Sequence, residues 1–299
     1  MKTVKRKIKG DIGERLFYGA LLALPLLQIA IFYFYVNFNS VMLAFKEYSF
    51  TEGFTWNFTA NFSKLWYELT KVNTLVTAFK NSIIVWFFTT VLGTFLAIVF
   101  AYYIYKKWAF AKTFKFFLFL PSVLPSILLI GVYKFFMDSA LPGYLGLSGT
   151  ILTGTTLFPT VVFYNVWICF GAQLLIYTGA MDQISPEIIE AGQVDGVTPI
   201  REFFSIVVPM ILPTVSTFVI ANVATLFTNQ ANLVGFFNFN DANLQPSHYT
   251  IGYYLFRMVG ATGGMDNYPY ASLLGILCTF IAFPLTMLAR RLLNGKEDA

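Results

Sequence analysis

Six uncharged polar or aromatic side chains lie within or beside long apolar stretches of the sequence. An amide offers both donors and acceptors to hydroxyl groups, and an aromatic face can cover the apolar side of a pyranose ring without burying a charge. These residues are therefore candidates for lining the path of a polar solute. The alternative is structural, because Asn and Gln also bond one membrane helix to another and Trp anchors interfaces. The six are Tyr164, Asn165, Trp167, Gln173, Asn222 and Asn229.

Residue types that commonly perform catalysis or bind metal are present without the spacing they need. Cys169 and Cys278 have no C-x-x-C or Cys/His pattern, so we expect two small core residues. His248 has no carboxylate or thiol neighbour in the sequence. The chain also contains no G-x-x-x-x-G-K-[ST] loop to cradle nucleotide phosphates. We therefore expect no metal site, no cofactor bound by this chain and no enzymatic activity of its own.

The composition excludes a water-soluble domain. Of the 299 residues, 57% are hydrophobic and only 12% are charged, about half of the roughly 25% that is typical of soluble domains. A mean hydropathy of +0.66 cannot be hidden in one core beneath a polar exterior. Lipid is therefore the expected solvent for most of the chain.

Six apolar segments are long enough to cross the membrane as helices, which predicts an all-α protein with six transmembrane helices. The third contains Pro121 and Pro125, so we expect it to be bent, with Lys134 reaching the interface at its far end. None contains an ionisable residue, so the relay that proton- or cation-coupled carriers use is missing and the energy must come from elsewhere. The segments are residues 16–38, 82–105, 116–133, 157–181, 206–227 and 268–289.

The basic residues predict the orientation of these spans. With the basic N-terminus (1–15) and the tail (294–299) both in the cytoplasm, fourteen of the twenty Lys and Arg residues lie on the inner side. This distribution agrees with the positive-inside rule and implies no nucleic acid as a partner. The first span is expected to be an uncleaved anchor, and 16–293 a single transmembrane domain.

Two long segments, 39–81 and 228–267, fall on the outer side in this orientation. Both are rich in phenylalanine, and we expect both to be folded. Their aromatic residues suit either the docking of an external partner or a cap that lies on the lipid headgroups. The sequence does not distinguish these two possibilities.

The cytoplasmic segment 182–205, here called the elbow, has the pattern of helix, turn, helix. Ser185-Pro186 is expected to start and cap the first helix, with Glu187 complementing its dipole. Asp195-Gly196 should end it, and Thr198-Pro199 should start the second helix, which runs toward the fifth span. Five apolar residues would then face the cytosol, which favours either a partner surface or a hairpin resting on the bilayer. They are Ile188, Ile189, Ala191, Val194 and Val197.

The elbow also carries a motif: Glu190-Ala-Gly, then Asp195-Gly, and after Phe203 and Ile206 the pair Pro209 and Pro213. This resembles the EAA loop of binding-protein-dependent ABC importer permeases. Gly192 stands where a second Ala is usual, and Ile189 where Tyr is common. The six-span layout, the long first outer loop and Asn165-x-Trp167 are similar to permeases of the maltose-type carbohydrate uptake branch.

The resemblance implies an ATP-driven import system with several other subunits. The partners would be a second permease, expected to be a paralogue, two cytoplasmic ATPase subunits that bind ATP and magnesium, and an extracytoplasmic solute-binding protein. The substrate would be a carbohydrate, expected to be an oligosaccharide, and the location the bacterial or archaeal plasma membrane. The ATPase-coupling residues implied are Glu187, Glu190, Ala191, Gly192, Asp195, Gly196 and Pro209, with Glu190 and Gly196 transmitting the movement.

A self-contained channel or secondary carrier for a polar solute is the alternative function. Such a protein would transport without nucleotide, and more often carries a charged relay or a repeated filter sequence, neither of which occurs here. Small polyols and glycerol phosphodiesters stay open as substrates of an importer.

Overall fold

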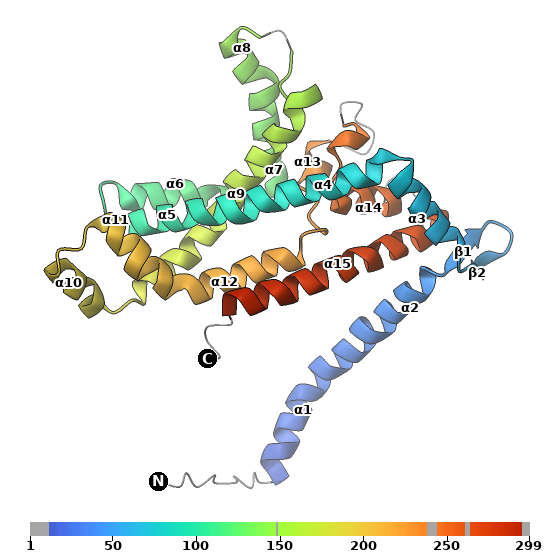
Figure 1. Ribbon diagram of the computed structural model, residues 1–299, viewed down its shortest axis with the longest axis horizontal. Coiled ribbons are helices and arrows are strands. Elements are labelled where there is room, and N and C mark those ends of the chain that lie inside the picture. The colour runs from blue at the N-terminus through green and yellow to red at the C-terminus, as the bar shows by residue number, and fades with distance from the viewer. Residues whose placement is uncertain (1–11, 148, 238–243, 261–263, 295–299) are drawn as a thin grey trace.

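Long helices built from the apolar segments make up most of the computed structural model, which describes residues 12–147, 149–237, 244–260 and 264–294 (Figure 1). Within these ranges, five helices are long and apolar enough to cross a membrane, and a sixth crossing exists if a bent pair counts as one span. The five are Leu16–Leu43, Asn73–Tyr105, Gly154–Asp182, Pro199–Ala224 and Met265–Leu293. The predicted all-α membrane fold is confirmed.

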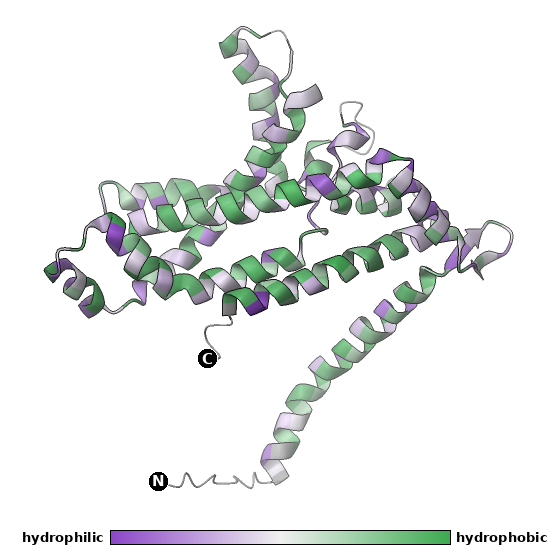
Figure 2. Ribbon diagram, viewed as in Figure 1, coloured by the Kyte–Doolittle hydropathy of each residue, from purple (hydrophilic) through white to green (hydrophobic). Residues whose placement is uncertain are grey.

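The first span diverges from the others and contacts α15 (Tyr268–Asn294) only toward its C-terminal end, α2 (Val36–Leu43) (Figure 1). It comprises α1 (Ile12–Gln28), the π-helical η1 (Ile29–Tyr35) and α2. None of the residues in its most apolar window is buried, and Figure 2 shows hydrophobic residues along its whole length. Lipid or another subunit must therefore cover it, because so large an apolar surface is not stable in water.

The second and fourth spans pack along each other. The second combines α4 (Asn73–Phe87), η2 (Phe88–Leu92) and α5 (Gly93–Tyr105), and α9 (Gly154–Asp182) forms the fourth. The second helix begins nine residues before residue 82, the predicted start. Its first turns are helical although they carry Lys80, because Leu75 and Ala78 on one face are buried in the core.

The third apolar segment is bent, as its prolines predict. It forms α6 (Ala111–Val123) and then α7 (Ser126–Phe135), η3 (Phe136–Ala140) and α8 (Leu141–Leu145), with an angle of 105° at the break. Leu124 takes an extended conformation before Pro125, as expected for a residue that precedes proline. Tyr105, the last residue of α5, and Asp182, the last residue of α9, line the same cavity. The chain between them therefore leaves this end of the bundle and comes back to it.

Lys134 on α7 contacts the short helix α13 (Leu233–Phe236), and its predicted place at the membrane interface stays a prediction. Its Nζ donates a hydrogen bond of 2.9 Å to the carbonyl oxygen of Phe236 and lies 5.4 Å from the ring centroid of Phe237. The ammonium group thereby satisfies a backbone carbonyl and joins α7 to α13.

The elbow continues into the fifth span. Its first helix is α10 (Pro186–Val194), and its second, α11 (Pro199–Glu202), runs through η4 (Phe203–Val207) into α12 (Val208–Ala224). The sixth span, α15 (Tyr268–Asn294), packs along α12.

The opposite end of the bundle carries the short elements, and we call it the hairpin end. Strands β1 (Lys46–Ser49) and β2 (Gly53–Trp56) pair antiparallel, with Lys46 opposite Trp56. Both predicted outer segments are folded where they are described. The remaining elements are α3 (Ala60–Thr70), η5 (Pro246–His248), α14 (Ile251–Gly260) and η6 (Met265–Asn267).

Two apolar clusters hold the bundle together. One surrounds Tyr164, Phe236 and Tyr253 toward the hairpin end, and the other surrounds Tyr102, Tyr177 and Phe203 toward the elbow. Leu96 and Trp167 pack against both clusters and so join them.

Candidate coupling elbow and solute pocket

The first elbow helix starts where predicted, at Pro186 directly after Ser185, but without the predicted capping bond. Ser185 makes no side-chain capping bond, so the predicted cap is wrong, whereas Thr198-Pro199 starts the second helix as predicted. Two start signals of α10 remain. Pro186 occupies the first helical position, where an amide would have no partner, and the acidic Glu187 lies in the first turn.

The end of α10 follows the prediction. Gly196 has φ +73°, a conformation that a side chain disfavours. Its amide donates to the carbonyl of Gln193 (3.1 Å), and the amide of Val197 donates to that of Gly192 (2.9 Å). These two bonds form a Schellman motif, which ends the helix and satisfies two of its last carbonyls.

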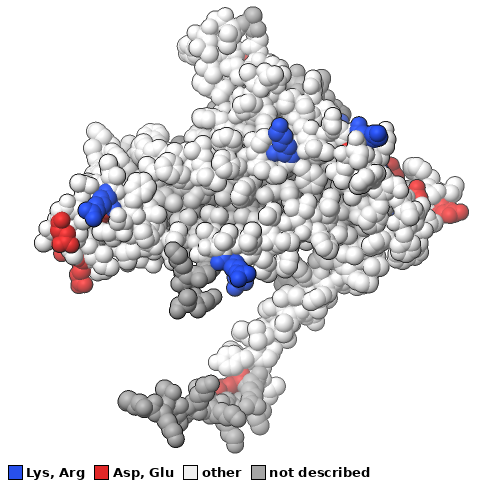
Figure 3. Space-filling view, viewed as in Figure 1, with Lys and Arg blue, Asp and Glu red and all other residues white. Residues whose placement is uncertain are grey.

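The predicted coupling residues are almost all exposed. Gly192 is buried, whereas the other six are accessible, and Figure 3 shows acidic side chains at the tip of α10. A Cβ added at Gly192 would lie 3.0 Å from Cδ1 of Ile206, so glycine allows α10 to lie close to the fifth span. The six exposed residues are Glu187, Glu190, Ala191, Asp195, Gly196 and Pro209.

The apolar residues of the elbow are divided between the core and the surface. Ile188 and Val194 are 41% and 88% exposed, and Ala191 is also exposed. Ile189 is 8% exposed and belongs to the cluster near the elbow, so its predicted presentation to the cytosol is wrong. Val197 is half-buried. α10 therefore uses Ile189 as an anchor and leaves a second apolar surface uncovered.

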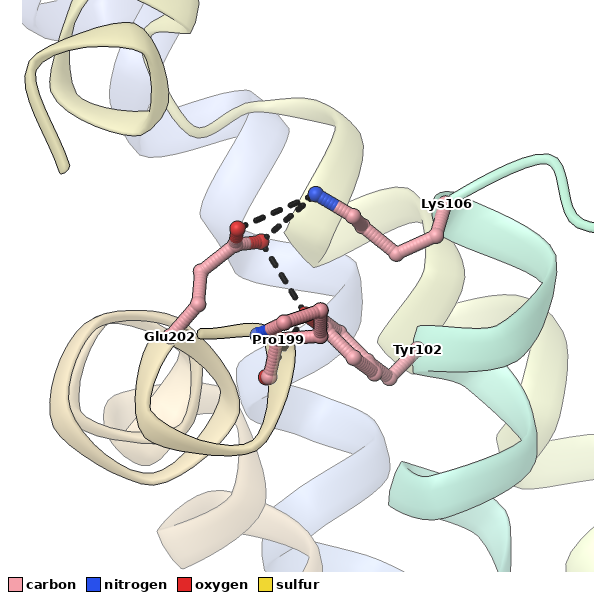
Figure 4. Close-up of polar contacts among 4 residues, drawn as sticks. All are labelled: Tyr102, Lys106, Pro199 and Glu202. Atoms are coloured by element: carbon pink, nitrogen blue, oxygen red, sulfur yellow. Dashed lines mark hydrogen bonds and ion pairs between the residues drawn. The ribbon is translucent and has the colours of Figure 1, made fainter. Parts of the chain in front are cut away.

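A buried ion pair that the sequence analysis missed fixes the second elbow helix to the second span (Figure 4). Nζ of Lys106, at the end of α5, lies 2.9 and 3.0 Å from the two carboxylate oxygens of Glu202 on α11. The hydroxyl of Tyr102 lies 3.1 Å from Oε1 of Glu202 and 3.0 Å from the carbonyl oxygen of Pro199. Glu202 is 3% exposed. These contacts satisfy a carboxylate that would otherwise be costly to bury.

A pocket of about 250 Å³ lies between the second, fourth and fifth spans, and we call it the amide pocket after the asparagines that line it. Three of the six predicted path residues line it: Asn165, Asn222 and Asn229. Its other lining residues, which sequence reasoning did not select, are Trp86, Thr89, Thr90, Ile168, Cys169, Thr225, Leu226 and Asn232. The lining therefore combines amide and hydroxyl side chains with apolar ones. Cys169 is half-buried at this pocket rather than in the core, whereas Cys278 is a buried core residue.

Asn165 supports the wall of the amide pocket. Its Nδ2 donates to the carbonyls of Val161 (2.8 Å) and Ala231 (2.9 Å), and its Oδ1 accepts from Nδ2 of Asn232 (2.8 Å). Ala231 and Asn232 both have positive φ, so this amide holds a strained turn in place. The side-chain amide of Asn165 is therefore bonded to protein groups, and the polar groups left for a solute belong to the other residues that line the pocket.

The other three predicted path residues do not line the amide pocket. Tyr164 is 1% exposed and packs against Tyr133 and Phe236. Trp167 stacks beside Tyr133, and Gln173 is buried, with its Nε2 3.7 Å from Sγ of Cys169. In this structure these three side chains have packing roles.

Within the described residues there is no group of three or more His, Cys, Asp or Glu side chains that could hold a metal ion. His248 is buried, and its Nε2 lies 3.1 Å from the carbonyl oxygen of Gly154. The histidine thus ties η5 to the start of α9.

Residues 90–295 match the family of binding-protein-dependent transport system inner membrane components, which is more than half of the chain. The chain belongs to this family. It is therefore a multi-pass transport component of the bacterial plasma membrane, and the elbow, the amide pocket and the spans between them all lie within or beside the matched residues.

Relatives of this transport component include two kinds of permease. The maltose/maltodextrin permease protein MalF of Vibrio parahaemolyticus is 23% identical over 257 residues, covering 80% of this chain and 48% of MalF. The sn-glycerol-3-phosphate permease protein UgpA of Shigella dysenteriae is 37% identical over 67 residues, covering 22% of this chain and 23% of UgpA. The chain spans less than half the length of these curated relatives.

The fold is that of a solved bacterial alginate ABC transporter, determined in complex with an alginate pentasaccharide-bound periplasmic protein. The TM-score is 0.75 at 21% identity, and the alignment covers 95% of this chain and 96% of that one. A second structure of a bacterial ABC transporter involved in the import of alginate gives a TM-score of 0.76, also at 21% identity.

Proposed function

We propose that this chain is a membrane-spanning subunit of an ATP-driven importer that carries a carbohydrate, expected to be an oligosaccharide. It would work beside a second permease, expected to be a paralogue, and two cytoplasmic ATPase subunits that bind ATP and magnesium. An extracytoplasmic binding protein would deliver the solute. The names of the relatives support this proposal, since they include a maltose/maltodextrin permease and an alginate ABC transporter.

The exposed surface of the elbow carries the proposal. α10 leaves Ile188 and Val194 accessible on a helix anchored by Ile189, next to exposed Glu187 and Glu190. A short helix with an uncovered apolar face suits insertion into a groove of another protein. The Glu202–Lys106 ion pair gives such a partner a firm connection to the spans.

A movement of the elbow can be transmitted to the membrane-spanning helices through two connections. Along the first, α11 continues as one helix through α12, which carries Asn222 into the amide pocket. Along the second, Glu202 connects α11 to α5 through Lys106. Rotation of rigid helices about their contacts is an ordinary switching mode, and it would change the width of a pocket between those helices.

The amide pocket supports an uncharged, hydroxyl-rich solute. The side-chain amides of Asn222 and Asn229 offer donors, and the indole ring of Trp86 offers an apolar face. The hydroxyl oxygens of Thr89 and Thr225 can accept hydrogen bonds, since their protons are donated to backbone carbonyls of their own helices. Its volume of about 250 Å³ would hold part of an oligosaccharide, with a second permease completing the path. The proposed orientation places the elbow and both ends of the chain in the cytoplasm, which follows from six crossings and the positive-inside rule.

Co-purification tests the proposal. The full chain is tagged at its C-terminus, solubilised gently, and every co-purifying protein is identified, together with the ATPase activity of the sample. We expect a stoichiometric ATP-hydrolysing subunit and a second multi-span protein. A chain that purifies alone, without nucleotide turnover, would instead favour the channel or carrier alternative.

A pair of variants then tests the role of the elbow surface. Val194→Asp places a charge on an 88% exposed apolar residue of α10, and we expect the retained ATPase activity to fall at least about tenfold. Phe50→Asp makes the same change at a 91% exposed residue of the hairpin and should leave that activity unchanged. Equal retention by both variants would contradict docking through α10.

A further inference from the structure

A basic and aromatic cavity lies at the elbow end of the bundle, away from the amide pocket. α5 ends and α6 begins beside it, and the last residue of α9 forms part of its wall. Its volume is about 450 Å³. Lys107, Lys112 and Lys115 line it together with Trp108, Phe110 and Asp182. We call it the lysine cavity.

The lysine cavity has an excess of positive charge that the rest of the described chain leaves unbalanced. Three lysines and one aspartate line it, and none of the three lysines forms an ion pair with any residue in the described ranges. The neighbouring Lys106 differs, because Glu202 occupies its ammonium group. The first residues of α6 also form part of the wall, so the partly positive end of that helix adds to the field.

The position of the lysine cavity suits the headgroup level of a membrane. It lies where the apolar helices Asn73–Tyr105 and Gly154–Asp182 both end. Trp108 is 44% exposed and Phe110 84% exposed, and such aromatic residues concentrate where lipid meets water. On α6, Phe116 and Phe117 directly follow Lys115 and are 60% and 62% exposed.

We propose that the lysine cavity binds the phosphate-bearing headgroup of an anionic phospholipid from the leaflet on the elbow side. The ammonium groups of Lys107, Lys112 and Lys115 would meet the phosphate, since basic pockets between membrane helices bind such headgroups. The acyl chains would cover Phe116 and Phe117 on α6. A soluble phosphate would satisfy the lysines but leave that apolar surface uncovered, which is why the lipid fits better.

Native mass spectrometry of the full-length protein, purified with whatever subunits accompany it, tests this site. The sample is equilibrated in micelles that contain equal amounts of phosphatidylglycerol and phosphatidylcholine, and the retained lipid is counted. We expect phosphatidylglycerol to be preferred. Lys112→Gln with Lys115→Gln should reduce that preference by roughly tenfold or more, because each lysine contributes about 1 kcal/mol near an anionic surface.

Two control variants keep the result specific. Arg290→Gln with Arg291→Gln removes two exposed charges from the end of α15, outside the cavity, and should leave the preference unchanged. Lys112→Arg with Lys115→Arg keeps the charge and should also retain phosphatidylglycerol. Equal retention by the Gln variant overturns the proposal, as does displacement of the lipid by an excess of inorganic phosphate, which would assign the site to a soluble anion. Neither result bears on the ATPase or the carbohydrate.

Discussion

The two ends of the bundle are held by different means. At the hairpin end, irregular segments are fixed by side chains that bond to backbone. Nδ2 of Asn81 donates to the carbonyls of Ser247 (2.8 Å) and Tyr249 (2.9 Å), and Oγ of Ser82 accepts from the amide of Ile251 (2.8 Å). These backbone groups lie in or beside the short η5 and in the first turn of α14, where a helix leaves them unpaired, so polar side chains on the neighbouring span bond to them.

The elbow end satisfies its backbone locally. α10 closes with its own Schellman bonds, and α11 is continuous with the fifth span. The long-range attachment of α11 to α5 is the charged contact of Glu202 with Lys106 and Tyr102. A self-contained helix that needs few outside bonds can present an uncovered face, whereas the hairpin end needs its neighbours in order to fold.

Breaking the ion pair should have the largest effect at the elbow end. Lys106→Met leaves the carboxylate of Glu202, 3% exposed, without its cation, which typically costs about 3–5 kcal/mol. The thermal midpoint in detergent and the hydrogen exchange of residues 186–202 would measure the loss. Lys106→Met with Glu202→Leu should recover most of it, since replacing both charges with apolar groups is often nearly neutral. A double variant as unstable as the single one would show that the pair is not the attachment.

Crowding the hairpin end should have the next largest effect. A Cβ at Gly252 would lie 2.6 Å from the carbonyl oxygen of Thr228 and 2.8 Å from the carbonyl group of Asn229. Gly252→Ala should therefore destabilise the protein by about 1–3 kcal/mol, seen as a lower thermal midpoint. Gly275→Ala on α15 is the matched control, because nothing lies within 4 Å of its added Cβ. Equal midpoints for the two variants would contradict the close approach.

A side chain at the elbow turn should have the smallest effect. Gly196→Ala forces φ +73° on a residue with a Cβ, at a cost of about 1–2 kcal/mol. We expect faster hydrogen exchange at residues 192–197 and little change at the hairpin end. Gly179→Ala, within α9 and without a close neighbour, should be neutral or stabilising. Faster exchange spreading to the hairpin end would show that the two ends do not differ as described.

Local patterns in the sequence predict most of the helices. The apolar segments, the bend at Pro125 and the turn at Gly196 each depend on a few adjacent residues, and the structure contains all three. The early start of the second span at Asn73 was missed, because burial against neighbouring elements extends a helix beyond its apolar run.

The site was harder to predict, because its contacts join distant parts of the chain. Lys106 and Glu202 are 96 residues apart, and each alone resembles an ordinary interfacial charge. Asn165 lines the amide pocket, yet its amide is used by Ala231 and Asn232, 66 and 67 residues away. Composition indicates that an amide in a span has a partner, but not whether that partner is backbone or solute.

The second helix of the elbow and the fifth span form one continuous helix, so the elbow acts as the short arm of a lever. The helix from Pro199 to Ala224 contains 26 residues and is therefore about 39 Å long at 1.5 Å per residue. The ion pair holds it near one end, while Asn222 on the wall of the amide pocket lies near the other. Asn222 lies 20 residues beyond Glu202, which is about 30 Å along the helix. A tilt of about five degrees about the Glu202 contact would thus displace Asn222 by about two to three ångströms, roughly the length of one hydrogen bond.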